Sequence, residues 1–150
     1  MAGAINTVLN NMYQNYAMVF SPASIMDIQR TSIAMVKQGF VQIPSDYIQF
    51  LGITDGLVWN GLELFSIHEY ERKDCVFPNI KLMPYQLSQN LKNLYPKSLI
   101  LGFAPEHFIL YESLKKEYVI IDRYTFAPVV ELPRLVDVLY FYWDSFSSAS

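Results

Sequence analysis

The sequence has little of the residues that build disulfide, metal or nucleotide sites. It contains one cysteine, two histidines and six glycines in 150 residues. The single Cys75 cannot form an internal disulfide, and zinc sites rely mainly on cysteine and histidine ligands. The glycines match neither the G-x-G-x-x-G pattern of dinucleotide-binding folds nor a phosphate-binding loop. The sequence therefore predicts a protein with no metal, no cofactor and no disulfide framework.

Long apolar runs and basic clusters are also absent. The longest purely apolar stretch, residues 138–143, is far shorter than the roughly 20 residues that a transmembrane helix needs. The N-terminus has neither the basic start nor the apolar run of a secretory signal. Basic residues occur singly or in pairs, so no stripe for nucleic-acid phosphates is visible. We expect a cytoplasmic protein that binds neither a membrane nor nucleic acid directly.

Apolar and aromatic residues, by contrast, are abundant. They make up 52% and 15% of the chain, which is enough to build a sizeable core at this length. No internal repeat and no linker divides the sequence. We expect a single domain over residues 1–150, with a helical lead-in at 1–40, a core at 41–146 and a frayed tail at 147–150.

The first 40 residues carry two helical patterns. Apolar residues recur at helical spacing from Ile5 to Phe20, which predicts an amphipathic helix ending near Ser21 and Pro22. Ser24 and Asp27 resemble a capping arrangement for a second helix, which Gly39 ends. Its expected apolar face is Ile25, Ile28, Met35 and Val36. We expect the two helices to pack as a hairpin.

The remaining sequence predicts a mainly antiparallel sheet with flanking helices. Pro44 suits the first turn of a third helix, and the negative charge of Asp46 complements the positive end of the helix dipole. The expected buried face of this helix is Tyr47, Phe50 and Leu51. Asp55 and Gly56 form a turn dipeptide, after which the chain reverses into a strand. The expected strands are 62–67, 98–103, 107–112, 117–122 and 129–132, with a hairpin turn at 114–116. A polar irregular crossing is expected at 69–79, followed by a short helix from Pro84 with Leu87, Leu91 and Leu94 on its face. A terminal helix is expected after Pro133, with Leu139 and Trp143 largely buried. This order predicts an α+β fold with a sheet of about four to six strands.

Catalytic motifs are not evident. His68 and Glu69 begin like the zinc motif H-E-x-x-H, but Arg72 stands at the second ligand position and cannot bind a cation. Cys75, His107 and Asp122 are a conceivable nucleophile, base and orienting acid, although no spacing brings them together. The pair Glu69 and Glu71 offers carboxylates for glycoside hydrolysis, but such pairs are usually solvated surface. We therefore expect no enzymatic activity.

The acidic residues are concentrated in one segment. Residues 55–75 hold five acids against two bases, a net charge of −3 that equals the charge of the whole chain. The segment also contains aromatic residues of types enriched at protein interfaces. The candidate partner-binding residues are Asp55, Trp59, Glu63, Glu69, Tyr70, Glu71 and Asp74. The alternative is a solvated acidic loop that binds nothing.

Part of the sequence resembles a known family. The pattern Ile43-Pro-Ser-Asp-Tyr-Ile-Gln-Phe-Leu51, followed by Thr54-Asp-Gly-Leu57 and Trp59-Asn-Gly-Leu-Glu-Leu-Phe65, is similar to the SUKH superfamily. The strand series from Ile100 to Ile120 and the helix after Pro133 resemble the second half of that family. Asp55 replaces the commoner Asn at the turn, which both residues allow. Residues 1–40 resemble the helical lead-in of one bacterial branch.

The resemblance implies a binding role and no catalytic centre. Bacterial members of the family often act as immunity proteins that neutralise a toxin, and fungal relatives act as scaffolding regulators. We therefore expect a non-catalytic immunity protein whose partner is a cognate protein toxin, with a basic nuclease-type domain as one candidate. The alternatives are an intracellular adaptor and, more remotely, a small hydrolase that uses His68 and nearby carboxylates.

Overall fold

The structure is a computed structural model that describes residues 2–72, 75–77 and 89–147. Its helices are α1 (Ala2–Gln14), α2 (Ile25–Lys37), α3 (Ser45–Leu51), α4 (Gln89–Leu94) and α5 (Leu135–Ser147). Its strands are β1 (Met18–Val19), β2 (Leu57–Trp59), β3 (Leu62–Leu64), β4 (Tyr70–Arg72), β5 (Cys75–Phe77), β6 (Ser98–Ala104), β7 (His107–Glu112), β8 (Glu117–Asp122) and β9 (Pro128–Leu132). Among the described residues, no helix combines the length and the apolar character that crossing a membrane requires.

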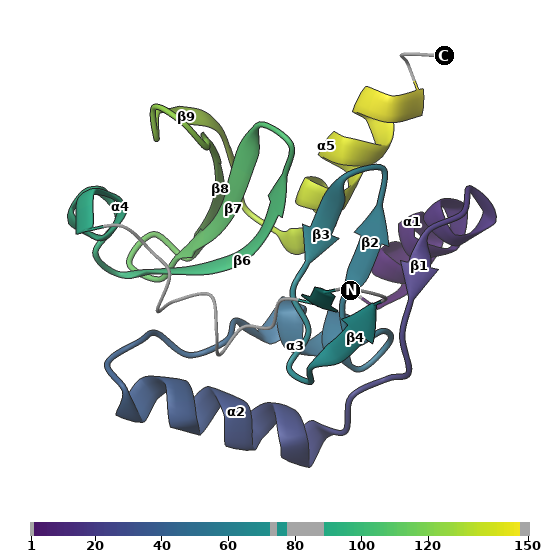
Figure 1. Cartoon of the computed structure of the whole chain (residues 1–150), viewed down its shortest axis with the longest axis horizontal. Helices are drawn as coiled ribbons and strands as arrows, with labels where there is room; N and C mark the ends of the chain where they lie inside the picture. Colours follow the sequence, from purple (N-terminus) through teal and green to yellow (C-terminus); the bar gives the residue numbers. More distant parts are fainter. Residues whose placement is uncertain (1, 73–74, 78–88, 148–150) are drawn as a thin grey trace.

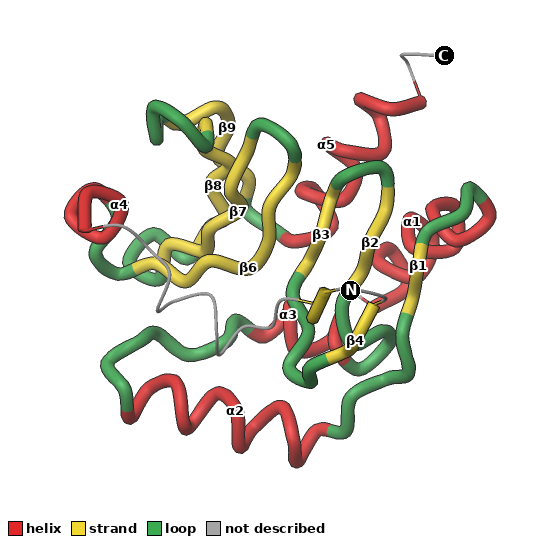
Figure 2. Tube along the Cα trace, in the orientation of Figure 1, coloured by secondary structure: helices red, strands yellow, loops and turns green. Residues whose placement is uncertain are grey.

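The strands form one large and one small antiparallel sheet (Figures 1 and 2). The large sheet has seven strands in the order β1-β2-β3-β6-β7-β8-β9, and β4 pairs with β5 in the small one. This architecture confirms the predicted α+β class, with more strands than expected. β7 and β8 coincide with their predicted ranges. Each is a short apolar and aromatic run with polar ends, and a turn around Lys116, which has a φ of 54°, joins them, so the hairpin is defined locally.

The sequence analysis missed the first hairpin turn of the sheet. The hairpin between β2 and β3 turns at Asn60 and Gly61, whose φ angles of 50° and 85° suit a type I′ turn. The expected reversal at Asp55 and Gly56 lies before β2, so the first strand of this hairpin was not predicted. The Asn-Gly dipeptide was the available signal.

The predicted N-terminal helical hairpin is wrong. α1 ends at Gln14. Two residues later Tyr16 has a positive φ of 73°, and the chain continues into the edge strand β1. α1 packs mainly against α5 at the other end of the sequence, while α2 lies apart from it in Figure 1. α1 supplies Ile5, Val8, Leu9 and Met12 to the hydrophobic core, so it belongs to the core and is more than a lead-in.

α2 begins and ends as predicted, but it buries a different face. The Ser24 hydroxyl accepts a hydrogen bond from the Asp27 N–H at 3.2 Å, which is the expected cap. The buried residues of α2 are Ile28, Thr31 and Met35. Ile25 and Val36, which the sequence placed on the apolar face, are exposed. Helical periodicity alone does not say which of two apolar sides meets the core.

α3 joins distant parts of the chain through polar side chains. The Asp46 carboxylate accepts hydrogen bonds from the backbone N–H of Leu135 at 2.7 Å and from the Tyr118 hydroxyl, so it also caps α5. The buried Tyr47 hydroxyl donates to the carbonyls of Phe65 and Leu101, at 2.6 and 3.2 Å. These contacts fix α3 against the sheet and against the start of α5.

Most predicted core residues are buried, whereas the crossing at 69–79 differs from expectation. Phe50, Leu51 and Leu139 are fully buried, as predicted, whereas Trp143 is only partly buried. The paired strands β4 and β5 occupy part of the crossing that was expected to be irregular. In α4, Leu91 is buried but Leu94 is exposed, and the expected helix start at Pro84 and Leu87 lies outside the described residues.

Candidate protein-binding site

Asp55 was predicted to bind a partner at the surface, but the structure buries it. It is 0% exposed, and its carboxylate accepts hydrogen bonds from the Ile67 N–H at 2.8 Å and from the Tyr70 hydroxyl at 2.8 Å. Its Oδ2 also lies 2.7 Å from Nδ1 of His68. The predicted surface role of Asp55 is therefore wrong. This buried carboxylate holds the 66–70 segment against the core, because unsatisfied buried charge is costly and these donors satisfy it.

His68 lies between two carboxylates. Its Nδ1 contacts Asp55, and its Nε2 lies 3.5 Å from Oδ2 of the half-exposed Asp27 at the start of α2. An imidazole held by an acid on one side resembles a base with its orienting group, but here the second nitrogen meets another carboxylate. The arrangement connects α2 to the 66–70 segment and places no hydroxyl or thiol nucleophile of a described residue at Nε2.

Trp59 is also buried, against expectation. It is 4% exposed, and its ring stacks on Trp143 at 5.4 Å between centroids and meets Phe146 edge-on at 5.0 Å. Its indole N–H donates to the Asn15 carbonyl. Trp59 therefore connects β2 with α5 and with the end of α1, and it is not available to a partner.

The other predicted residues are divided between surface and partly buried positions. Glu69 is exposed, and Glu63 is half-buried on β3 opposite Phe103. Tyr70 is half-buried, and burial together with the hydrogen bond and charge of Asp55 raises its pKa above the usual value. Glu71 lies in β4, but its side chain is outside the described set, as is the whole of Asp74. The structure thus does not gather the seven predicted residues into one exposed patch.

The conceivable triad is partly assembled by the sheet. His107 of β7 and Asp122 of β8 face each other in register, which the sequence did not predict. The Asp122 carboxylate accepts hydrogen bonds from the N–H groups of Thr125 and Tyr124, and these bonds lower its pKa. Nδ1 of His107 lies 3.1 Å from the Tyr142 hydroxyl. Both side chains therefore have structural contacts, and the thiol of Cys75 lies outside the described side chains.

One cluster among the described residues has carboxylates close enough to hold a cation. The side chains of Glu112, Glu117 and Glu131 come within 4.8 Å of one another. The Lys115 ammonium lies 3.7 Å from Glu112 and 3.4 Å from Glu131, and these acids raise its pKa. The lysine already supplies positive charge at this point, so the cluster is explained without a metal ion.

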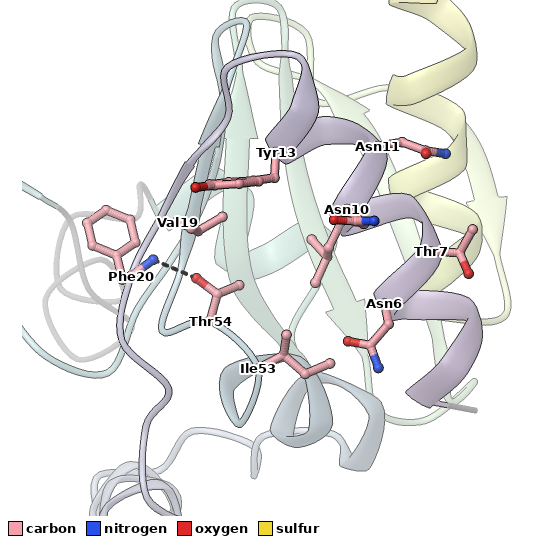
Figure 3. Close-up of a pocket in the computed structure, with 10 residues that line it drawn as sticks. Asn6, Thr7, Asn10, Asn11, Tyr13, Val19, Phe20, Ile53 and Thr54 are labelled. Carbon is pink, nitrogen blue, oxygen red and sulfur yellow. Dashed lines mark hydrogen bonds between the residues drawn. The ribbon is translucent and has the colours of Figure 1, made fainter.

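A groove between α1 and the β1 segment is a concave feature of the described surface that has a polar wall. Its volume is about 480 Å³, within the range of ligand-binding clefts. Figure 3 shows its residues. They come from α1 (Asn6, Thr7, Asn10, Tyr13), from the β1 segment (Val19, Phe20) and from the turn before β2 (Ile53, Thr54). Apart from the Tyr13 phenol, these side chains carry no titratable group, so the groove offers asparagine amides and one phenol beside the apolar Val19 and Ile53.

Exposed aromatic residues extend this groove. Tyr13 and Tyr16 are both largely exposed, and β1 is the outermost strand of the large sheet. Phe20 lines the groove, but its ring points away from the other lining side chains in Figure 3 and stacks on Tyr70 at 4.7 Å between centroids. Phe20 therefore connects the groove with the segment that carries the exposed Glu69. We call this combined surface, from Asn6 and Tyr13 through Phe20 to Glu69, the groove face.

Sequence reasoning identified only the acidic edge of the groove face. The asparagines of α1 were visible as the polar positions between its apolar residues, but asparagine is a poor helix former with no functional pattern of its own. The groove exists because β1 returns beside α1, which only the tertiary structure shows. Comparison of the chain with protein-family models, with curated proteins and with solved structures finds no match in any of the three.

Proposed function

We propose that the chain is a non-catalytic, cytoplasmic protein-binding domain that neutralises a cognate toxin, as immunity proteins of the SUKH superfamily do. The observation that carries this proposal is the groove face. It combines a concave, hydrogen-bonding wall, an open sheet edge and exposed aromatic rings within one surface. Such a combination suits recognition of a protein, because sheet edges accept further strands and tyrosine rings are favoured at interfaces.

The chemistry of the described side chains supports binding over catalysis. The groove wall carries no carboxylate, imidazole or ammonium group to act as a general acid or base. The titratable residues that the sequence singled out, Asp55 and His68, are engaged with each other and with backbone groups. Both features fit a surface that is complementary to another protein.

Charge supports a basic partner. The chain has a net charge of −3, and Glu69 is exposed at the rim of the groove face. Many domains that act on nucleic acid are basic, so an acidic rim speeds their approach and competes for the surface that binds phosphates. A nuclease-type toxin domain is therefore the partner class that we propose.

The experiment starts in the native cell. Tagged wild-type chain is cross-linked and purified, and its capture is compared with that of Asn10→Lys, which places a long charged side chain in the groove. Gln49→Lys makes the same amide-to-lysine change on the exposed side of α3 and serves as the matched control. We expect one toxin-like protein to be lost with Asn10→Lys and retained with Gln49→Lys.

The captured protein then decides the function. Its isolated toxic domain, expressed in a test host, is expected to stop growth, and co-expression of the wild-type chain is expected to restore it. If the captured protein is not toxic, the immunity role is wrong. If rescue occurs equally with Asn10→Lys, the role stands but the groove face is not the interface.

A further inference from the structure

α2 is apolar on two opposite sides, and the fold covers only one of them. Ile28 and Met35 are buried against the core. Four other apolar residues of the same helix are 49–60% exposed: Ile25, Met26, Ile33 and Val36. A helix that is apolar all round is normally buried on all sides. The described residues give this outer side no packing partner, so its composition is not explained by folding of the described chain.

The exposed apolar residues form one stripe, which the exposed polar Gln29 interrupts between Met26 and Ile33. Met26 and Ile33 are seven residues apart, and Val36 follows Ile33 by three, which is the spacing that places side chains along one side of a helix. Ile25 and Val36 extend the same stripe on its other margin. This repeat is typical of a helix that packs against a second helix.

The stripe has one basic margin. Arg30 and Lys37, also seven residues apart, follow the stripe on one side, and both are exposed. Arg30 is 71% exposed, and its ion pair with Asp27 is long, at 3.7 Å. The opposite margin contains Ser32, which carries no charge. The stripe is therefore flanked by positive charge on one side only.

This charge pattern argues against a second copy of the chain as the occupant. In an antiparallel pair of α2 helices, equivalent margins face each other, so Arg30 and Lys37 of both copies would repel. In a parallel pair, the basic margin would face the uncharged margin and gain no attraction. Neither arrangement of two copies offers complementary charge.

We propose that the outer side of α2 is a docking surface for an amphipathic helix of a partner protein, with aspartate or glutamate along the flank that meets Arg30 and Lys37. The apolar stripe of the partner helix would cover Met26, Ile33 and Val36, which supplies affinity by removing apolar surface from water. The acidic flank would set orientation and selectivity. No stripe residue lines the groove, and α2 lies apart from α1 in Figure 1, so the inference does not depend on the toxin-binding proposal.

The test uses two synthetic helical peptides as probes. Both are about 20 residues long with leucine at the repeating apolar positions, and they differ only in carrying glutamate or lysine along the flanks. Binding to the full chain is followed by fluorescence anisotropy at low salt. We expect the glutamate-flanked peptide to bind about tenfold or more tightly than the lysine-flanked one.

Surface variants locate the site. Ile33→Gln is expected to lower the affinity for the glutamate-flanked peptide by about tenfold, because it replaces an apolar contact residue of the stripe with a polar one. Leu114→Gln is the matched control, since Leu114 is 79% exposed and belongs to the turn between β7 and β8, outside α2. Unfolding by urea, followed for each variant, should be unchanged, because these substitutions are on the surface.

Charge reversal distinguishes specific docking from non-specific hydrophobic binding. Arg30→Glu combined with Lys37→Glu is expected to reverse the preference, so that the lysine-flanked peptide binds more tightly. Equal binding of both peptides, or no reversal in the double variant, would overturn the proposal. Reversible dimerisation of the wild-type chain that Ile33→Gln abolishes would also overturn it, because a second copy would then be the occupant.

Discussion

Replacing Asp55 by alanine tests the claim that this carboxylate is structural. The substitution removes the acceptor for the Ile67 N–H and the Tyr70 hydroxyl, both at 2.8 Å, and for the His68 ring at 2.7 Å. It leaves the Ile67 N–H buried without its partner. It also frees the segment that positions Tyr70 against Phe20.

The magnitude follows from the kinds of contact that are lost. A hydrogen bond to a charged group contributes about 1.5–3 kcal/mol, and a buried group left without its partner costs about 1–3 kcal/mol. These contributions belong to neighbouring groups and are not additive, so the total is expected to be smaller than their sum. We expect Asp55→Ala to lower the free energy of unfolding by about 3–5 kcal/mol, a large share of the stability of an ordinary domain.

Two comparison variants make the measurement specific. Asp55→Asn keeps one carbonyl oxygen for the Ile67 N–H but loses the charge, so an intermediate cost of about 1–3 kcal/mol is expected. Asp27→Ala removes the other carboxylate beside His68, which is half-exposed and 3.5 Å away. Exposed pairs contribute at most about 1 kcal/mol, so this variant should be nearly neutral.

Urea unfolding followed by circular dichroism gives all three free energies. The expected order of destabilisation is Asp55→Ala, then Asp55→Asn, then Asp27→Ala. Similar urea midpoints for Asp55→Ala and Asp27→Ala would refute the reasoning. The buried carboxylate and the half-exposed one would then contribute equally to the free energy of unfolding. In that case Asp55 would be free for the partner-binding role that the sequence first suggested.

Four further predictions concern the core, the pH response, the partner and metal independence. Phe50→Ala should cost about 3–5 kcal/mol in a urea melt, because it removes a fully buried ring and leaves a cavity. Burial raises the pKa of Tyr47, Tyr118 and Tyr142 above the usual value of about 10, so stability that is complete below pH 10 should fall as pH rises further. Phenolate absorbance that reaches its full value for all 11 tyrosines before any loss of ellipticity would contradict this coupling. Glu69→Lys should slow association with the captured toxin domain several-fold at low salt, with a smaller defect at high salt, in stopped-flow measurements at two ionic strengths. Excess chelator should leave the melting temperature unchanged, whereas a structural metal would make folding depend on it.

Elements with local signals could be predicted from the sequence. The ranges of β7 and β8 were predicted residue by residue, because two short apolar and aromatic runs with a polar turn between them are visible in neighbouring residues of the chain. The cap of α2 at Ser24 was predicted for the same reason. The burial of Phe50, Leu51 and Leu139 followed from their helical spacing, which needs no knowledge of the partner element.

The tertiary structure alone decided how these elements meet, and with that the candidate site. α1 packs mainly against α5 and not against α2, although α2 also carries apolar residues, because hydrophobic contact does not specify its partner. Asp55 became a buried hub and Trp59 a core residue only when distant donors and rings closed around them. The seven candidate residues share a stretch of sequence, but exposure depends on which atoms pack above each one. Burial is a property of contacts between segments far apart in the chain, and no local pattern of charge or aromatic residues encodes it.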